Sequence, residues 1–259
     1  MNFIRNLTVV ATILMVGGAA RAQNLYGAGG LFLNPTAGFA AKGSLTPSFL
    51  TIGQSDINGM GSALQTYYGV AYSATDDLEI GGAYLKLSPG GNRPDASYGV
   101  FAKYRLVEGK LGGRPDIAVG GNYVAGGDLD ATTAFLAARY TPHTSFHEKH
   151  PIHLHGGLLY ADEYYGIKRK TAVPYGGIDI GLTKSFSVFA EVRGRMSADG
   201  GGVGDVKAPA AVGLVWRPNR NYTVALAYGK NGRSRENKLG IGVGFTLGTQ
   251  GGSGERRAQ

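Results

Sequence analysis

All five histidines of the chain lie within 13 residues, in the stretch TPHTSFHEKHPIHLH, at positions His143, His147, His150, His153 and His155. Imidazoles at this density could bind a divalent ion, or one of them could activate the hydroxyl of Ser145. His143 and His147 are four residues apart, and only a helix would bring their side chains together. Pro142 and Pro151 argue against a helix, and the residues between them show no apolar periodicity. We therefore expect a polar turn here, with no metal site, no cofactor and no catalytic residue.

Charged side chains that fall on one face of predicted strands form a second candidate site. Lys103 and Arg105 flank Tyr104, and alternate residues of a strand point to opposite faces, so the two cations share a face. Acids and bases on an inner face can pair and brace a barrel wall, or they can line a passage that selects a solute. The same parity gives these lumen-facing candidates: Glu79, Lys103, Arg105, Arg139, Asp179, Glu191 and Arg193.

The N-terminus and the composition restrict the class of protein. Arg5, an apolar run over 7–17 and the small-residue motif before Gln23 predict a secretory signal peptide over residues 1–22. The chain has no cysteine, which excludes a disulfide scaffold, a lipoprotein anchor and a zinc-thiolate centre. The modest positive charge is scattered along the chain, so we expect no nucleic-acid partner.

Period-2 alternation of apolar residues runs from Ser44 onward and predicts an all-β protein. No amphipathic helix competes with it. We expect twelve antiparallel strands, over 44–53, 62–74, 78–87, 96–107, 116–125, 131–141, 152–161, 173–183, 186–195, 208–217, 222–230 and 237–247.

The two faces of these strands indicate a membrane. In YTVALAYG, Tyr222 and Leu226 fall on one face, whereas Thr223 and Ala225 fall on the other. Large apolar residues opposite Gly, Ala, Ser and Thr are typical of a transmembrane barrel, because the large side chains face lipid and the small or polar ones face the lumen. Tyrosines near strand ends suit the two interfacial girdles. The sequence therefore predicts a transmembrane up-and-down β-barrel of about 12 strands in the bacterial outer membrane.

Loop lengths predict how the barrel is oriented. Most of the short connections, such as TDD and KS, fall on one side and most of the long, glycine-rich ones on the other, and short turns are periplasmic in outer-membrane barrels. An even number of strands then leaves both termini in the periplasm. We expect a periplasmic N-terminal segment over 23–43, a barrel over 44–247 and a polar tail over 248–259.

Two stretches carry a family resemblance. GLFLNPTAGFAAKGSLTPSFL places Pro35-Thr36-Ala37 ahead of the first strand, and GVAYSATDDLEIGGAYLKL is a strand, an acidic turn and a strand. Both resemble the bacterial outer-membrane β-barrels of the YjbH-like group, which is associated with exopolysaccharide production. The resemblance implies the outer membrane and a connection to envelope polysaccharide.

We expect a non-enzymatic barrel that acts as a structural protein or a narrow pore. Its partners would be outer-membrane lipid and a small solute or polysaccharide. Two alternatives stay open: a phospholipase-like barrel enzyme and a soluble periplasmic β-protein.

Overall fold

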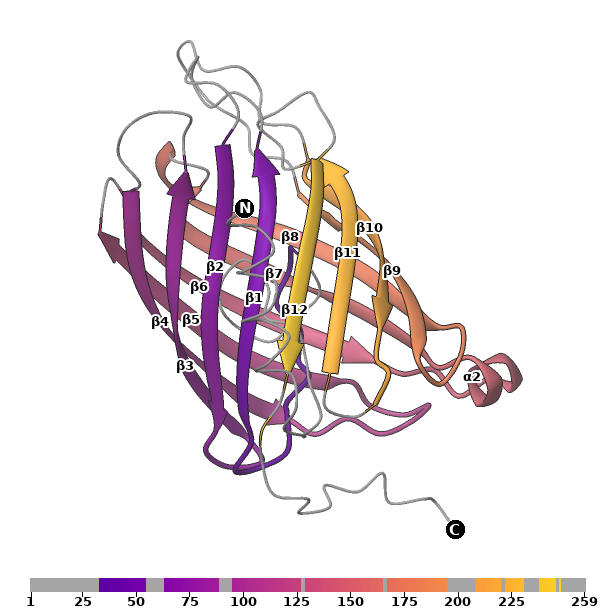
Figure 1. Ribbon diagram of the computed structural model, residues 1–259. Coiled ribbons are helices and arrows are strands. Elements are labelled where there is room, and N and C mark those ends of the chain that lie inside the picture. The colour runs from indigo at the N-terminus through magenta and orange to yellow at the C-terminus, as the bar shows by residue number, and fades with distance from the viewer. Residues whose placement is uncertain are drawn as a thin grey trace.

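The computed structural model describes residues 33–54, 63–88, 95–126, 129–164, 167–194, 208–219, 222–230, 238–245 and 247. These residues form one closed barrel in which consecutive strands are antiparallel neighbours (Figure 1). The twelve strands are β1 (Leu45–Gln54), β2 (Ala63–Ser73), β3 (Leu78–Ser88), β4 (Asp95–Val107), β5 (Asp116–Gly126), β6 (Leu129–Tyr140), β7 (Ile152–Tyr164), β8 (Ile167–Gly181), β9 (Phe186–Arg193), β10 (Ala210–Trp216), β11 (Tyr222–Lys230) and β12 (Lys238–Phe245).

Pairing of the first strand with the last closes the barrel. β1 lies antiparallel to β12, with Ser48 opposite Gly244 and Ile52 opposite Gly240. Closure leaves no open sheet edge, which a strand-built membrane protein requires because lipid offers no hydrogen bonds to an edge. The expected all-β fold and the twelve-stranded, up-and-down order are confirmed.

Two local expectations were wrong. The stretch 162–172 was expected to be a loop, but β7 extends to Tyr164 and β8 begins at Ile167, with a register irregularity between Ala161 and Glu163. The sequence of this stretch, DEYYGIKRKTA, does not alternate between large apolar and small residues, whereas the backbone pairing that forms the hairpin, such as Tyr164 with Ile167, does not require that alternation. The turn after β6 contains a short helix, α2 (Ser145–Lys149), although none was expected.

The helix α2 is explained by its first residues. Thr144 is its N-cap, and the Thr144 hydroxyl accepts a hydrogen bond of 3.0 Å from the backbone N–H of His147. A capped single turn needs no apolar face, so periodicity could not reveal it. The proline at 151 lies just beyond the end of the helix and prevents its continuation.

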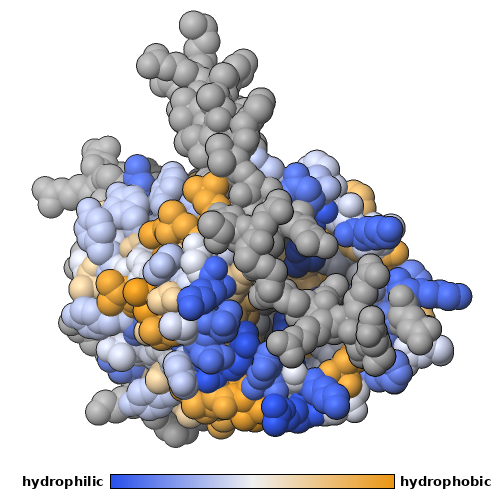
Figure 2. All heavy atoms as spheres, turned by 90° about the horizontal axis from the view of Figure 1, so that it is seen from below, coloured by the Kyte–Doolittle hydropathy of each residue, from blue (hydrophilic) through white to orange (hydrophobic). Residues whose placement is uncertain are grey.

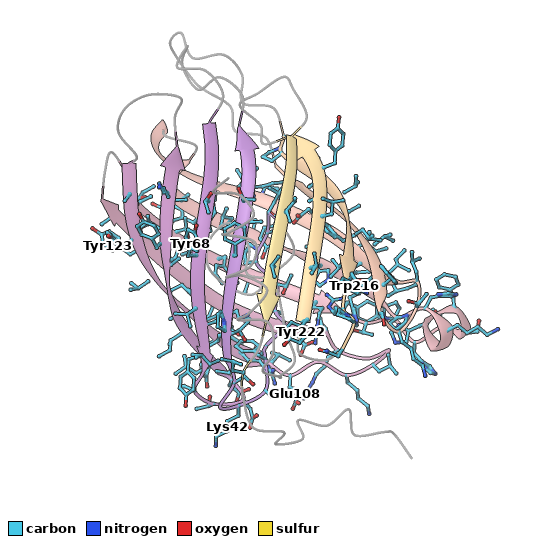
Figure 3. The ribbon with its side chains drawn as sticks, viewed as in Figure 1. Lys42, Tyr68, Glu108, Tyr123, Trp216 and Tyr222 are labelled. Atoms are coloured by element: carbon cyan, nitrogen blue, oxygen red, sulfur yellow. The ribbon has the colours of Figure 1, made fainter. Side chains whose placement is uncertain are left out.

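The outward faces of the strands are apolar and aromatic. Phe49, Tyr68, Tyr84 and Tyr98 form a row across β1–β4, with successive ring centroids 5.3, 6.0 and 5.2 Å apart. In Figure 3, aromatic side chains lie at two heights: Tyr68 and Tyr123 lie in the upper half, whereas Trp216 and Tyr222 lie near the end that carries α2. An aromatic band at each interface is what a membrane barrel presents to lipid.

The inward faces, by contrast, bury small residues and polar groups. Thr223 and Ala225 are buried, whereas their neighbour Leu226 is 45% exposed on the outside. An apolar outer surface around an interior that buries charged and polar groups is the reverse of a soluble protein, so this surface is not compatible with a soluble periplasmic protein and places the chain in the outer membrane. At the α2 end, viewed along the barrel in Figure 2, hydrophilic residues predominate. No helix among the described residues is long and apolar enough to cross a membrane.

Glycines on the inner face make room for aromatic rings. Four inner rings each lie over a glycine directly opposite on the neighbouring strand, where an added Cβ would overlap the ring or the wall. The pairs are Phe101 over Gly81, Phe135 over Gly120, Tyr175 over Gly157 and Phe189 over Gly213. Each ring therefore packs against the wall beside it, and this packing accounts for part of the high glycine content.

Candidate functional site: the barrel interior

A segment ahead of β1 lies inside the barrel. We call Leu33–Phe39 the strap; all seven of its residues are buried, and Ala37 has no exposed surface. The strap belongs to the stretch 23–43 that the sequence assigns to a periplasmic segment. The side of the membrane on which residues 23–43 begin stays a prediction, but the described strap packs against the inner wall (Figure 1).

Apolar residues of the strap contact both halves of the interior. Leu33 belongs to a cluster with residues of β1, β9, β10 and β11, among them Phe189 and Val215. Ala37 and Phe39 belong to a second cluster, which is built from β2 and from β4 to β8. The strap therefore joins two apolar clusters that lie on different parts of the wall.

Two charged side chains of β9 hold the first residues of the strap. Glu191 and Arg193 are two residues apart on one strand and share its inner face, and we call this pair the clamp. The Glu191 carboxylate accepts hydrogen bonds from the backbone N–H of Leu33 (2.7 Å) and of Asn34 (3.1 Å), and from the Asn34 side-chain amide (3.0 Å).

The other half of the clamp donates to the same two strap residues. Arg193 Nε donates to Asn34 Oδ1 at 2.9 Å, and Arg193 Nη2 donates to the carbonyl oxygen of Leu33. Charged groups form stronger hydrogen bonds than neutral ones, and here they satisfy strap groups that would otherwise be buried without partners.

A second anchor holds the other end of the strap. Lys103 Nζ donates to the Gly38 carbonyl oxygen at 2.6 Å and lies 3.1 Å from the Glu79 carboxylate. The Phe39 ring lies beside two cations, with Lys103 Nζ 4.5 Å and Arg105 Cζ 4.7 Å from its centroid. Lys103 and Glu79 are both buried, so this anchor is an ion pair shielded from water.

The two anchors lie on nearly opposite walls. Lys103 is on β4 and Arg193 is on β9, five strands apart in a closed ring of twelve. A segment that is held at Leu33 by β9 and at Gly38 by β4 must cross the interior between them. The strap therefore lies across the interior of the barrel.

Two of the remaining lumen-facing candidates, Arg139 and Asp179, each form a pair with a residue on a neighbouring strand. Arg139 donates to Asp116 Oδ2 from Nε (3.0 Å) and Nη2 (2.7 Å), between neighbouring strands β5 and β6. Asp179 Oδ2 lies 2.7 Å from His155 Nε2, between β7 and β8. Arg139 and His155 are themselves opposite each other on β6 and β7. Ionisable side chains thus continue across neighbouring strands of the inner wall.

Arg105 lies at the edge of this charged wall. Its guanidinium contacts Asp77 at 3.6 Å and Glu108 at 3.9 Å, and both acids are largely exposed. The structure therefore joins Glu79 with Lys103 and brings Arg105 to the same aromatic ring. It brings Glu191 and Arg193 together on the strap, and it places Arg139 and Asp179 in separate pairs.

The histidine stretch lies at the α2 end of the barrel. His147 Nδ1 accepts a hydrogen bond from the backbone N–H of Ile152 (3.0 Å), and His153 Nδ1 lies 2.9 Å from the Thr141 hydroxyl. The ring centroids of His153 and His155 are 6.4 Å apart. Among the described residues, no group of three or more His, Cys, Asp or Glu side chains could hold a metal ion.

Sequence reasoning missed the strap and one acid. Asp116 pairs with Arg139, but a partner across strands depends on register, which parity alone does not give. The strap did leave a signal in the sequence. The stretch LFLNPTAGF carries no charge and has large apolar residues at both ends, so water is an unfavourable place for it.

Comparison with known proteins supports the fold. No family model matches the chain, and no curated protein matches it. Among solved structures, the KdgM porin is similar, with 13% identity and a TM-score of 0.54 over 77% of this chain and 98% of the porin. The KdgM porin in complex with disordered oligogalacturonate gives 12% identity and a TM-score of 0.52 over 78% of this chain and 98% of that one. The NanC porin gives 10% identity and a TM-score of 0.50 over 79% of this chain and 99% of that porin. At these identities the likeness concerns the fold, which is that of outer-membrane porin barrels.

Proposed function

We propose that this protein is a non-enzymatic outer-membrane barrel that forms a narrow pore, and that the strap keeps the pore closed at rest. The observation that carries the proposal is the path of the strap, which is buried across the interior and held by Glu191 and Arg193 on one wall and by Lys103 on the other. The strap lies outside the twelve strands, so it can leave the interior without breaking their pairing with one another.

The charged inner wall favours a pore over a purely structural barrel. Buried ions are costly, and apolar side chains could fill an inert barrel at lower cost. Glu79, Lys103, Glu191 and Arg193 instead lie on the inner face, where they would line a water-filled passage once the strap moves. Twelve strands lie between the filled eight-stranded barrels and the open porins of 16–18 strands, which suits a narrow passage.

A saccharide is the class of solute that the similar proteins favour for this pore. The KdgM porin occurs in a complex with disordered oligogalacturonate, and the N-terminal residues of this chain resemble the exopolysaccharide-associated YjbH-like group. We extend both to this chain as a proposal: a small solute or a piece of envelope polysaccharide passes through the barrel.

An enzymatic role has weaker support in the arrangement of the histidines. Ser145 is the first residue of α2, at one end of the barrel and away from the lipid-facing middle of the wall (Figure 1). The Nδ1 atom of its neighbour His147 already accepts the N–H of Ile152, so this nitrogen is occupied. A lipid-cleaving site would need its imidazole beside the serine hydroxyl, where the acyl chain arrives.

Conductance across a planar bilayer tests the proposal. The test variant carries Asn34→Gly and Phe39→Ala, which remove one side-chain anchor at each end of the strap and leave every wall residue intact. We call it the strap-release variant. We expect the wild type to stay closed for most of the recording and the strap-release variant to conduct steadily.

The matched control is Phe146→Ala, which removes an exposed ring on α2 outside the barrel and should leave conductance unchanged. Folding of each variant is checked by its shift in electrophoretic mobility on heating. A folded strap-release variant that never conducts would contradict the pore, and a wild type that conducts as well as the variant would contradict the closed resting state.

A further inference from the structure

The clamp binds the strap through amide groups. The peptide group between Leu33 and Asn34 is held at both ends, because its carbonyl oxygen accepts from Arg193 Nη2 and its N–H donates to Glu191 at 3.1 Å. The side-chain amide of Asn34 is held in the same way, with its oxygen 2.9 Å from Arg193 Nε and its nitrogen 3.0 Å from Glu191 Oε2. Two amides are thus each recognised by one donor and one acceptor.

The chemistry of the clamp suits amides better than anions. A carboxylate can only accept hydrogen bonds when ionised and a guanidinium can only donate them, so the pair suits a ligand that presents a donor and an acceptor in fixed positions, as an amide does through its N–H and C=O. The two side chains carry opposite charges on the same face of β9. An anionic solute that approached Arg193 would therefore be repelled by Glu191, whereas a neutral amide satisfies both.

We propose that the clamp is the solute-recognition site of the pore, and that it selects solutes that carry a secondary amide group. This inference rests on the proposed function, because a solute can reach the clamp only when the strap has left it. In the closed state the strap is then a ligand from the protein's own chain. Short peptides and N-acetylated saccharides present the same pair of hydrogen-bonding groups, and both are sources of this chemistry.

Block of ion current through the strap-release variant tests the inference. Its clamp is intact, and the probes are the capped peptide acetyl-Leu-Asn-Pro-amide and N,N′-diacetylchitobiose. The control is cellobiose, which has a hydroxyl where the chitobiose has an acetamido group. We expect both amide probes to block at concentrations at least about tenfold lower than cellobiose, since two hydrogen bonds to charged groups are gained.

An added Glu191→Gln change should reduce this advantage, because the neutral Gln amide keeps one acceptor oxygen but loses the negative charge that strengthens the hydrogen bond from the ligand N–H. Block by only one amide probe would support the inference and identify the source of the solute. Equal block by cellobiose would overturn it, as would tighter block by digalacturonate, because the site would then recognise hydroxyls or negative charge.

A second measurement keeps the inference testable without a conducting variant. Thr36→Cys places a thiol of similar size in the buried strap of an otherwise wild-type chain. If the amide probes compete with the strap, diacetylchitobiose should raise the rate of thiol labelling at position 36 severalfold and cellobiose should not. An unchanged labelling rate would contradict the inference. A conducting pore without discrimination among the probes would contradict the inference alone and leave the proposed function standing.

Discussion

Removing the ammonium group of Lys103 should strongly destabilise the barrel. Lys103 is 1% exposed, and its Nζ lies 3.1 Å from Glu79 and 2.6 Å from the Gly38 carbonyl oxygen. Lys103→Met keeps the side-chain length but leaves the buried Glu79 carboxylate without this cation. Breaking a buried ion pair from one side costs about 3–5 kcal/mol, and we expect a loss of that size in the free energy of unfolding.

The double variant separates the ion pair from packing. Replacing both partners, Lys103→Met with Glu79→Leu, leaves no buried charge at this site and should cost less than about 2 kcal/mol, because apolar replacements of buried pairs are often close to neutral. The double variant should therefore be more stable than Lys103→Met alone. The control is Glu108→Gln, which removes an exposed partner of Arg105 at 3.9 Å and should change the free energy of unfolding by less than about 1 kcal/mol.

Equilibrium unfolding in urea of the barrel refolded into phospholipid vesicles measures these differences. The slope of the free energy against urea must stay the same among variants for the values to be compared. If Lys103→Met costs no more than the double variant, the two charges are not coupled, and the description of this anchor as a shielded ion pair would be wrong.

Three further predictions concern packing, selectivity and orientation. Gly81→Ala should destabilise the barrel by about 1–3 kcal/mol in the same assay, because the added Cβ would overlap an inner ring. Gly156→Ala is the control and should change stability little, because its added Cβ would make only an ordinary contact at 3.6 Å. Equal losses of stability in the two variants would refute the ring-over-glycine packing. Arg193→Glu places like charges side by side in the clamp, and should both raise conductance and shift selectivity toward cations in bilayer recordings; an unchanged current would argue against the clamp. A cysteine replacing Gly201, which lies outside the described residues, should react with an impermeant thiol reagent on intact cells. A cysteine replacing His147 should react only after the outer membrane is opened. The reverse result would invert the predicted orientation of the barrel.

The faces of the strands could be predicted from the sequence because membrane strands obey one simple rule. Large residues such as Leu226 and Tyr228 alternate with small ones, and lipid and lumen impose that alternation on each strand independently of its neighbours. The number of strands and the inward direction of charges such as Lys103 follow from the same parity. Neither depends on knowing which residues meet across strands.

Pairing and the strap could not be predicted in this way. That Glu79 meets Lys103, or that Arg139 meets Asp116, depends on strand register, and the loops do not encode register in a form that parity reveals. The strap has no repeating pattern, so its sequence shows only that Leu33 and Phe39 favour burial. Which wall receives them is decided by charges far away in the chain, at Glu191 and Arg193 on β9.

The position of the strap is the central claim, and the reactivity of a cysteine at position 36 tests it most directly. The protein has no native cysteine, and Thr36 is 7% exposed, so Thr36→Cys gives a single thiol in the strap. Ser145→Cys, on exposed α2, is the reference. In the folded barrel we predict that the thiol at 36 reacts with a water-soluble reagent at least about tenfold more slowly than the thiol at 145, because only transient opening exposes it. Adding Asn34→Gly and Phe39→Ala should bring the two rates close together. Equal rates in the otherwise wild-type chain would place the strap outside the barrel and contradict the account of a closed pore.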